Sequence, residues 1–385
     1  MRTAFALLLL LVATVSCNSE NKKQPTAAVI TTQDTSRQAE AYKRFSGTIA
    51  GQPVVLNLQM GKHAYATISG SYYYVKQGKP IGLYILPDST VQNGYLVDED
   101  PEEKNSDTQP HWKFVYDGNT IIGKWTSADG KKTYDISLKE DYPQGSYHLG
   151  IWAKEDSIPY QRGKARAVAT VSYQVLVLQH STKEETDFFN KCIHQELGCD
   201  KMPEASLDQC VQTQIDSYAA GYKRELADVD DTLLSEAFNN YYQGISMPVL
   251  YNDNGWLIVE SNFSDYSGGA HGNYGVSYLN MDMQNKKLWK LEDIMTVDSV
   301  KLQTILEKQA RKAFDIPAGG KLSDGLLTDR VMPNGNFYIT NTGITFVYNP
   351  YEIAAYAYGI ASFFIPYTQI KELLKPAFVQ RMQLQ

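Results

Sequence analysis

The chain of 385 residues carries 36 basic and 43 acidic side chains, a formal net charge of −7. Nucleic-acid binding needs a concentration of Lys and Arg that this sequence lacks, so we exclude nucleic acid as a partner. An acidic chain is better matched to neutral glycans or to basic partners. Its 27 tyrosines are typical of strands with one solvent-facing side, and Tyr also lines glycan-binding surfaces.

Residues 1–16 are predicted to be a lipoprotein signal peptide. Arg2 gives a charged start, an apolar run covers residues 4–13, and a small residue precedes Cys17. Ten apolar residues are too few to span about 30 Å of hydrocarbon as a helix, which favours cleavage. Cys17 is then the expected acylated residue, anchoring the protein to a membrane outside the cytoplasm, on the periplasmic or the surface side. An ordinary secretory signal is the alternative.

Residues 17–40 are expected to form a disordered tether. Ser, Asn, Lys, Gln, Pro and Thr dominate the segment, which has little apolar content to bury. Such a tether holds a folded part away from the membrane surface. No later apolar run approaches the ~18 residues of a membrane span, so we expect no second membrane segment.

The segment 41–150 is predicted to be an all-β meander domain. Short apolar or alternating runs at 54–58, 65–68 and 133–138 are separated by turn signals that contain Gly, Asn and Pro. The acidic run 98–103 does not have the spacing of a calcium loop. We expect it to form a solvated loop, with a patch for a basic partner as the alternative.

The segment 151–380 is predicted to be an α+β domain with an antiparallel sheet and packed helices, in one part or in two sub-parts, 151–275 and 276–380. The predicted fold class of the chain is therefore α+β, with an all-β N-terminal part. The elements expected in chain order are strand 165–178, helices 182–197, 205–225 and 230–242, strands 247–251, 256–263 and 274–283, helix 297–314, strands 337–340, 344–348 and 360–365, and helix 367–374.

Three cysteines remain for the folded part once Cys17 is acylated, and an exported protein favours disulfides. Cys192 and Cys210 lie at equal distances from the middle of the turn between two predicted helices, on the apolar stripe of each. We therefore predict a disulfide between Cys192 and Cys210, with Cys199 free. A zinc site with His194 as the fourth ligand is the alternative, although its spacings fit no familiar pattern.

The most unusual string is Asp265-Tyr266-Ser267-Gly268-Gly269-Ala270-His271-Gly272, which combines glycines with one titratable ring. Such a loop can bind a carboxylate or a sugar through exposed N–H groups; a tight turn in which His271 caps a carbonyl is the alternative. A second string, 349–359, contains a single acid. We predict a ligand loop drawn from both strings, made of Asp265, Tyr266, Gly268, Gly269, His271, Gly272, Tyr351 and Glu352.

Three strings carry a resemblance to a known family: Gly268-Gly269-Ala270-His271-Gly272, Phe346-Val347-Tyr348-Asn349-Pro350-Tyr351-Glu352-Ile353-Ala354 and Ile365-Pro366-Tyr367. Over roughly residues 160–376 the chain resembles a family of envelope domains of unknown function. Its members form the extracellular part of the lysozyme-sensing anti-sigma factor RsiV and accompany the catalytic domain of the peptidoglycan deacetylase PdaC. The resemblance implies an α+β sensing or binding module, with lysozyme, a basic protein, as one ligand.

The chain lacks the Asp-Asp and His-x-x-x-His spacing of such a deacetylase, and it has no Gly-x-Ser-x-Gly elbow. The sequence thus predicts a lipid-anchored envelope protein without a cofactor that binds a cell-wall glycan or an envelope protein such as lysozyme. The alternative is a peptidoglycan-acting hydrolase or transferase that uses Asp265, His271 and Glu352. Hydrogen-bond reach among these three side chains favours the enzyme, whereas a flat aromatic surface with a buried His271 favours binding.

Overall fold

The computed structural model describes residues 41–60, 68–100, 108–297 and 299–384. The predicted signal peptide, the tether and Cys17 lie outside these residues. Residues 39–385 group into one unit, and the domain boundaries expected at 150 and 275 stay predictions. The described strands fall into two sheets, one of 15 strands and one of three.

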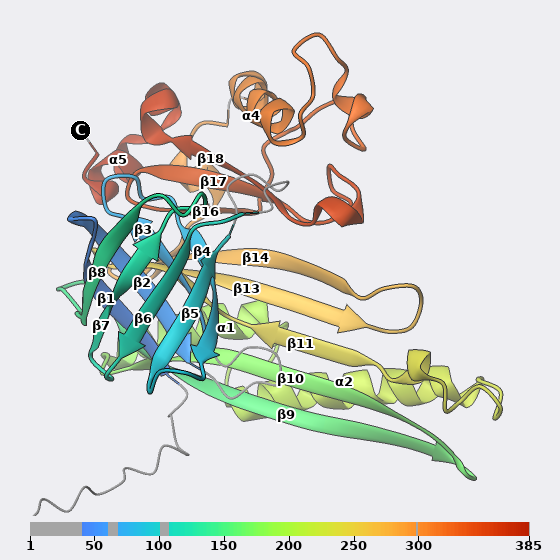
Figure 1. The fold of residues 1–385 in the computed structure, drawn as a ribbon. Coiled ribbons are helices and arrows are strands. Elements are labelled where there is room, and N and C mark those ends of the chain that lie inside the picture. Colours follow the sequence, from blue (N-terminus) through green and yellow to red (C-terminus); the bar gives the residue numbers. More distant parts are fainter. Residues whose placement is uncertain (1–40, 61–67, 101–107, 298, 385) are drawn as a thin grey trace, which may run out of the picture. The chain divides into compact units, whose positions relative to one another are not determined.

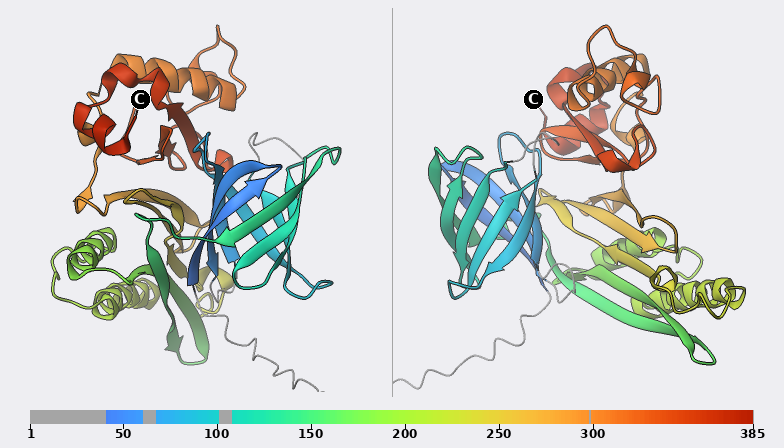
Figure 2. Two further views of the ribbon diagram at one scale, coloured as in Figure 1. Left: turned by 90° about the vertical axis from the view of Figure 1, so that its left-hand side faces the viewer. Right: turned by 45° about the vertical axis from the view of Figure 1, so that its right-hand side comes forward.

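The first eight strands close into a barrel. Each pairs antiparallel with the next along the chain, and β8 returns to pair with β1 (Figures 1 and 2). The closing register sets Phe45 opposite Glu140. Among the described residues, the β1–β8 pairing joins the two edges of the eight-stranded sheet, which protects backbone groups that a free edge would expose. The strands are β1 (Ala41–Ile49), β2 (Gln52–Met60), β3 (Ile68–Tyr74), β4 (Ile81–Asp88), β5 (Gly94–Glu99), β6 (His111–Tyr116), β7 (Thr120–Thr126) and β8 (Thr133–Glu140).

Side chains fill the barrel interior. Alternate residues of β2, from Val54 to Met60, point inward and are buried there, as the two-residue period of a strand requires. One acid, Glu99, lies in this core and accepts hydrogen bonds from Trp112 Nε1 at 2.6 Å and Trp125 Nε1 at 2.7 Å. Tyr72 Oη donates a third, at 2.8 Å. Three donors compensate this carboxylate for the water it has lost.

From β9 the same sheet leaves the barrel and continues as a layer with the order β15-β14-β13-β11-β10-β9, in which β12 pairs with β13. β10 and β11 run parallel because two helices form the crossover between them. The strands are β9 (His148–Arg162), β10 (Ala165–Gln179), β11 (Tyr242–Ser246), β12 (Val249–Asp253), β13 (Trp256–Tyr266), β14 (Asn273–Asp282) and β15 (Lys287–Leu288).

The crossover helices α1 (Lys183–Glu196) and α2 (Leu207–Ala227) cover one face of this layer (Figure 1). Both begin with a capping box, in which the side chains of Thr182 and Ser206 accept a hydrogen bond from the third helical N–H. In the described part of the chain, no helix has the length and apolar content needed to cross a membrane.

The opposite face of β13 and β14 packs against the C-terminal segments. A separate antiparallel sheet is formed by β16 (Phe337–Ile339), β17 (Gly343–Tyr348) and β18 (Ala361–Pro366), and α4 (Ser299–Ala313) packs on β18 (Figure 1). The short helices α3 (Leu291–Ile294) and α5 (Pro376–Met382) contact each other beside it.

β13 belongs to two hydrophobic cores at once. Trp256 and Ile258 lie in the core shared with the C-terminal segments, whereas Leu257 and Val259 lie in the core under α1 and α2. All four side chains are 0 % exposed. This double burial explains the uninterrupted apolar sequence at the start of the strand.

The predicted fold class is wrong. The N-terminal part is a closed barrel and no open meander. Residues after the barrel form a mostly β continuation of its sheet that contains a parallel pair, which is not the predicted antiparallel α+β fold. The physical reason is that closure joins β1 to β8, which lie about 90 residues apart, so no local pattern signals it.

Two predicted helices are also wrong. The segment 230–242 forms turns and a 3₁₀ helix at Ala237–Asn239, and β11 begins at Tyr242. Asp230 Oδ1 accepts hydrogen bonds from Thr232 N and Oγ1, a local turn that competes with a helix. The segment 367–374 forms two 3₁₀ turns.

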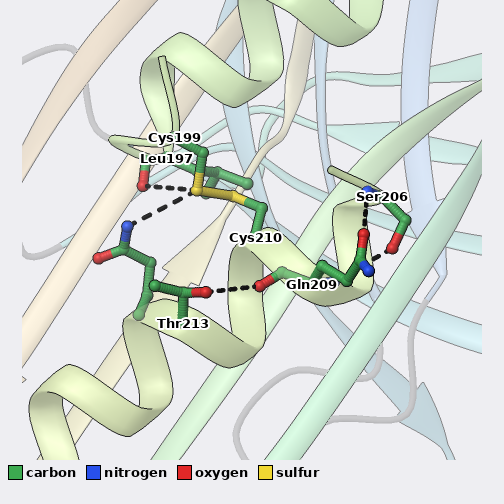
Figure 3. Close-up of a disulfide and its surroundings, with 7 residues drawn as sticks. Leu197, Cys199, Ser206, Gln209, Cys210 and Thr213 are labelled. Carbon is green, nitrogen blue, oxygen red and sulfur yellow. Dashed lines mark hydrogen bonds between the residues drawn. A yellow bond between two sulfur atoms is a disulfide. The ribbon is translucent and has the colours of Figure 1, made fainter. Parts of the chain in front are cut away.

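The disulfide joins Cys199 to Cys210, with a Cα–Cα distance of 5.9 Å, so the predicted Cys192–Cys210 pair is wrong (Figure 3). α2 begins only after Ser206, which places Cys210 in its first turn, beside the turn that carries Cys199. Cys192 is a free, buried thiol, and burial raises its pKa to about 11. The zinc alternative loses two of its thiolates to this bond.

Buried polar side chains join the barrel wall to β12. Asn57 Nδ2 donates to the Leu250 carbonyl at 3.0 Å, and Tyr42 Oη donates to Asn57 Oδ1 at 2.8 Å. Arg44, 2 % exposed, donates from Nε to the Asn252 carbonyl at 2.9 Å. The outer face of the barrel is therefore fitted to the layer by specific hydrogen bonds as well as by apolar contact.

Candidate functional site

The predicted ligand loop is the connection between β13 and β14. Gly268 and Gly269 have φ angles of +91° and +92°, which L side chains rarely adopt, so the glycines set the shape of this turn. Tyr266 Oη donates to the Gly269 carbonyl at 3.1 Å across the loop. The hairpin therefore presents His271 at its end in a defined position.

His271 is exposed and lies against tyrosine rings. Its imidazole stacks on Tyr356, with ring centroids 3.9 Å apart and an interplanar angle of 24°. Nδ1 lies 2.7 Å from the Gly272 carbonyl, which can only accept, so Nδ1 carries the proton. In the neutral tautomer Nε2 is then an acceptor, and Tyr351 Oη lies 3.4 Å from it.

Gly272 lies between two stacked pairs of rings, Tyr242 with Tyr266 and His271 with Tyr356. Tyr356 Oη donates to its carbonyl at 2.7 Å, and a Cβ atom at Gly272 would lie 2.5 Å from the hydroxyl of Tyr242. A side chain here would push the two groups apart. We call the resulting exposed and half-buried surface the aromatic platform; it consists of Tyr242, Tyr266, His271, Tyr274, Tyr351 and Tyr356.

Tyr351 has a strained backbone. Its φ of +71° lies in the left-handed region, which is costly for a bulky residue. The side chain is nevertheless 54 % exposed, so burial of the ring does not repay this cost. Strain of this kind, about 1–3 kcal/mol, is concentrated at functional sites. The strained position holds the Tyr351 ring beside Tyr356, at a centroid distance of 5.8 Å.

The predicted site residues come together only in part. Among the described residues, no hydrogen bond joins His271 to Asp265 or to Glu352. The charge of Asp265 acts on Tyr218 of α2, where burial first and then this carboxylate raise the pKa of the phenol. Glu352 Oε2 instead accepts a hydrogen bond from Asn334 Nδ2 at 3.3 Å. Hydrogen bonds therefore do not assemble the alternative enzyme site of Asp265, His271 and Glu352. His271 is exposed, whereas the predicted binding surface was expected to bury it.

Sequence reasoning missed three members of the platform, Tyr242, Tyr274 and Tyr356. Tyr356 lies in the predicted second string, but its role depends on contacts with a hairpin about 85 residues earlier in the chain. Burial, followed by the neighbouring Tyr356, raises the pKa of Tyr274. The available signal was the even spacing of Tyr274 and Tyr278 in β14, which places both on one face of the strand, whereas β11 contains Tyr242 alone.

Fold and site together define a β-rich protein, a closed barrel with a layered extension, that exposes an aromatic surface at the end of one hairpin. Residues 292–368 match the family described as Protein of unknown function (DUF3298). No curated protein matches the chain significantly. The expected resemblance to a domain of unknown function is confirmed at this level, over a shorter segment than residues 160–376.

Two solved structures of members of that family are similar to this chain. One, from Bacteroides fragilis NCTC 9343, is 26 % identical with a TM-score of 0.55; the match covers 63 % of this chain and 100 % of that one. The other, from Pseudomonas aeruginosa PAO1, is 18 % identical with a TM-score of 0.43, covering 60 % and 96 %. The first supports a shared fold over nearly two thirds of the chain.

Proposed function

We propose that the protein is a lipid-anchored binding protein of the cell envelope that holds a cell-wall glycan on the aromatic platform. The observation that carries this proposal is the exposed Tyr351 ring, kept beside Tyr356 and His271 at the expense of backbone strain. Tyrosine offers a flat apolar face together with a polar tip, which suits the apolar faces and hydroxyl groups of sugars.

Binding is a better account of this surface than catalysis. A hydrolase needs an acid or base positioned on a reacting group, and among the described residues no hydrogen bond joins the three predicted catalytic side chains to one another. Stacked rings, by contrast, need no further group to bind a sugar. The resemblance to the RsiV- and PdaC-type domains supports an envelope ligand, and the net charge of −7 keeps a basic protein such as lysozyme as the other ligand to test.

The proposal predicts that Tyr351→Gly weakens glycan binding without destabilising the fold. Glycine removes the ring and relieves the strain at φ +71°, so the melting temperature should stay the same or rise. Loss of one aromatic contact worth about 0.5–1.5 kcal/mol lowers affinity roughly 2- to 13-fold. The measurement is co-sedimentation with insoluble peptidoglycan and titration with N-acetylglucosamine oligomers. Tyr84→Ala, which removes a ring that is 55 % exposed on barrel strand β4, is the matched control.

Equal binding by the wild type, Tyr351→Gly and Tyr84→Ala would remove the platform from the contact. If neither glycan probe binds but lysozyme does, and the lysozyme affinity falls at higher salt, the ligand is a basic protein. Tyr356→Ala, which also unstacks His271, should weaken glycan binding at least as much as Tyr351→Gly.

The anchor is tested separately. Cys17→Ser should move the protein from the membrane fraction to the soluble fraction, because each buried methylene of the acyl chains contributes about 0.8 kcal/mol and this substitution removes them all. Fractionation followed by washing at high salt gives the measurement. A variant that stays in washed membranes would contradict acylation at Cys17.

A further inference from the structure

A cavity of about 580 Å³ lies where the barrel wall meets the sheet layer. Its walls come from β2, β3 and β4 of the barrel, from β10 to β14 of the layer, and from β16 and β18. This size is within the range of small-molecule sites. The cavity shares no residue with the aromatic platform, so a ligand bound in the cavity would be distinct from a glycan bound on the platform.

Two carboxylates face this cavity. Glu260 of β13 accepts a hydrogen bond from Tyr278 Oη at 2.9 Å. Burial raises the pKa of Glu260, hydrogen bonds from Tyr278 and Asn262 act in the opposite direction, and the charge of Asp100 raises it again. Asp100 keeps contact with solvent, yet the surrounding wall withdraws enough water to raise the pKa of its carboxyl as well. The two acids therefore share one electrostatic environment.

Gly82 fixes the position of Asp100. The Asp100 N–H donates to the Gly82 carbonyl at 2.9 Å, and a Cβ atom at Gly82 would collide with the Asp100 carboxylate. The absence of a side chain at this point of β4 thus lets the carboxylate lie over the strand at the cavity wall.

A third acceptor is contributed by Gln59, which is 8 % exposed. Its Nε2 donates to the Met247 carbonyl at 3.0 Å, and this bond fixes the orientation of the amide. Its Oε1 accepts no hydrogen bond from any described residue, although Gln59 lines the cavity. As an amide oxygen in the cavity wall, it is placed to accept a hydrogen bond from a ligand that donates.

We propose that this cavity binds a small organic primary amine in its ammonium form. An ammonium group has three N–H donors and one positive charge, which match the three acceptors Glu260, Asp100 and Gln59. No Lys, Arg or His lines the part of the cavity that the structure describes, so the two acids have no cation of their own there. Two carboxylates are few for a calcium site, which takes six to eight oxygen ligands.

The rest of the wall suits the organic part of such a ligand. The rings of Tyr278 and Tyr338, with centroids 4.9 Å apart, lie on one side, and Leu83 and Met247 are further apolar members. Aromatic faces also attract an ammonium group directly. The ligand therefore has a short apolar body that carries the amine.

The proposal requires a pH dependence of a defined sign. The ligand binds the ionised carboxylates, whose pKa values are raised in the free protein, so affinity falls as the pH is lowered through these raised values. The titratable groups facing Glu260 are Asp100, Tyr278 and Tyr338, and the two phenols stay neutral throughout this range because burial raises their pKa values. Binding should release protons, which calorimetry in buffers of different ionisation enthalpy detects.

The test compares n-pentylamine, cadaverine and the neutral 1-pentanol by isothermal titration of the folded chain. Both amines should bind and 1-pentanol should not. Glu260→Gln should weaken amine binding at least tenfold and flatten the pH dependence. Gly82→Ala, which changes no charge, should also weaken binding, because its methyl group displaces the Asp100 carboxylate. Asp135→Asn, at a carboxylate whose side chain is 82 % exposed on β8, is the charge-matched control and should bind normally.

Three results would overturn the proposal. Amine binding that is equal in the wild type and in Glu260→Gln would place the contact elsewhere. Equal binding of 1-pentanol and n-pentylamine would show an apolar site without charge recognition. Binding of Ca²⁺, with no response to either amine, would assign the carboxylates to a metal. Melting curves of each variant show that loss of binding is not loss of fold, and the platform variant Tyr351→Gly should bind amine like the wild type.

Discussion

Replacing Arg381 with methionine is expected to lower the free energy of unfolding by about 3–5 kcal/mol, because a buried carboxylate is left without its cation. Asp282 has a side chain that is 0 % exposed, and Arg381 donates to its two oxygens from Nε and Nη2, both at 2.9 Å. The guanidinium also lies 4.7 Å above the Trp256 ring, so packing is lost together with charge. Urea denaturation of the purified chain measures the change.

The control is the exposed pair of Lys124 and Asp135, whose side chains are 62 % and 82 % exposed. Lys124→Met should change stability by less than about 1 kcal/mol, because solvent replaces the lost partner. The double variant Arg381→Met/Asp282→Leu should recover part of the loss, since it removes the unpaired charge as well. A loss in Arg381→Met no larger than that of the control would contradict the pairing.

Arg44→Met is the second large effect, an expected loss of about 2–4 kcal/mol. Arg44 lies on the outer face of β1 and donates to the Asn252 carbonyl, to the Asp141 carbonyl at 2.9 Å and to Asp253 Oδ2 at 3.1 Å. The carboxylates of Asp141 and Asp253 are partly exposed and can regain water, which makes this loss smaller than that at Arg381. The carbonyl of Asn252 is fully buried and cannot form a hydrogen bond with water in place of the one it loses.

Hydrogen exchange can show which part of the fold loses stability in Arg44→Met, in addition to how much stability is lost. Arg44 ties the barrel to β12, so hydrogen exchange at residues 249–253 should speed up in Arg44→Met. Lys43→Met is the matched control on the same strand. Its ammonium pairs with Glu140 of β8 and donates to the Gly118 carbonyl, so exchange in β12 should stay slow. Unchanged exchange in both variants would mean that the barrel contact does not support β12.

Local signals in the sequence were enough for part of the fold. The helices expected at 182–197 and 205–225 correspond to α1 and α2. The start of each helix is set by a capping box, which lies within four consecutive residues and can therefore be recognised in the sequence. The helix expected at 297–314 corresponds to α4. Most strands from 247 onward also lie where their apolar runs are.

The errors have a common physical origin in contacts between distant residues. Closure of the barrel depends on pairs such as Phe45 with Glu140, and neither residue carries a sign of the other. The wrong disulfide came from placing the turn midway between Cys192 and Cys210, whereas the loop before α2 lengthens the turn on one side and brings Cys199 opposite Cys210.

The sequence predicted part of the aromatic platform and none of the cavity. The glycines and His271 of one string were visible, and so was Tyr351, because their composition is unusual. Asp100 lies in an acidic run expected to be a solvated loop, and Glu260 reads as an ordinary polar residue in a strand. Asp100, directly after β5, and Glu260 of β13 line one cavity because these parts of the barrel and the layer meet in space, which no spacing in the chain reveals.

The double burial of β13 has a consequence for how the strand finds its alignment. Usually a slip by one residue would turn apolar side chains to solvent, and that penalty fixes the pairing. Here Trp256 to Val259 are apolar on both faces, so a slip would exchange one hydrophobic environment for another. The alignment must then be specified by polar groups that fit in one arrangement only. Glu260 of β13 lies opposite Tyr278 of β14 and accepts a hydrogen bond from its hydroxyl at 2.9 Å, so this pair acts as such a marker.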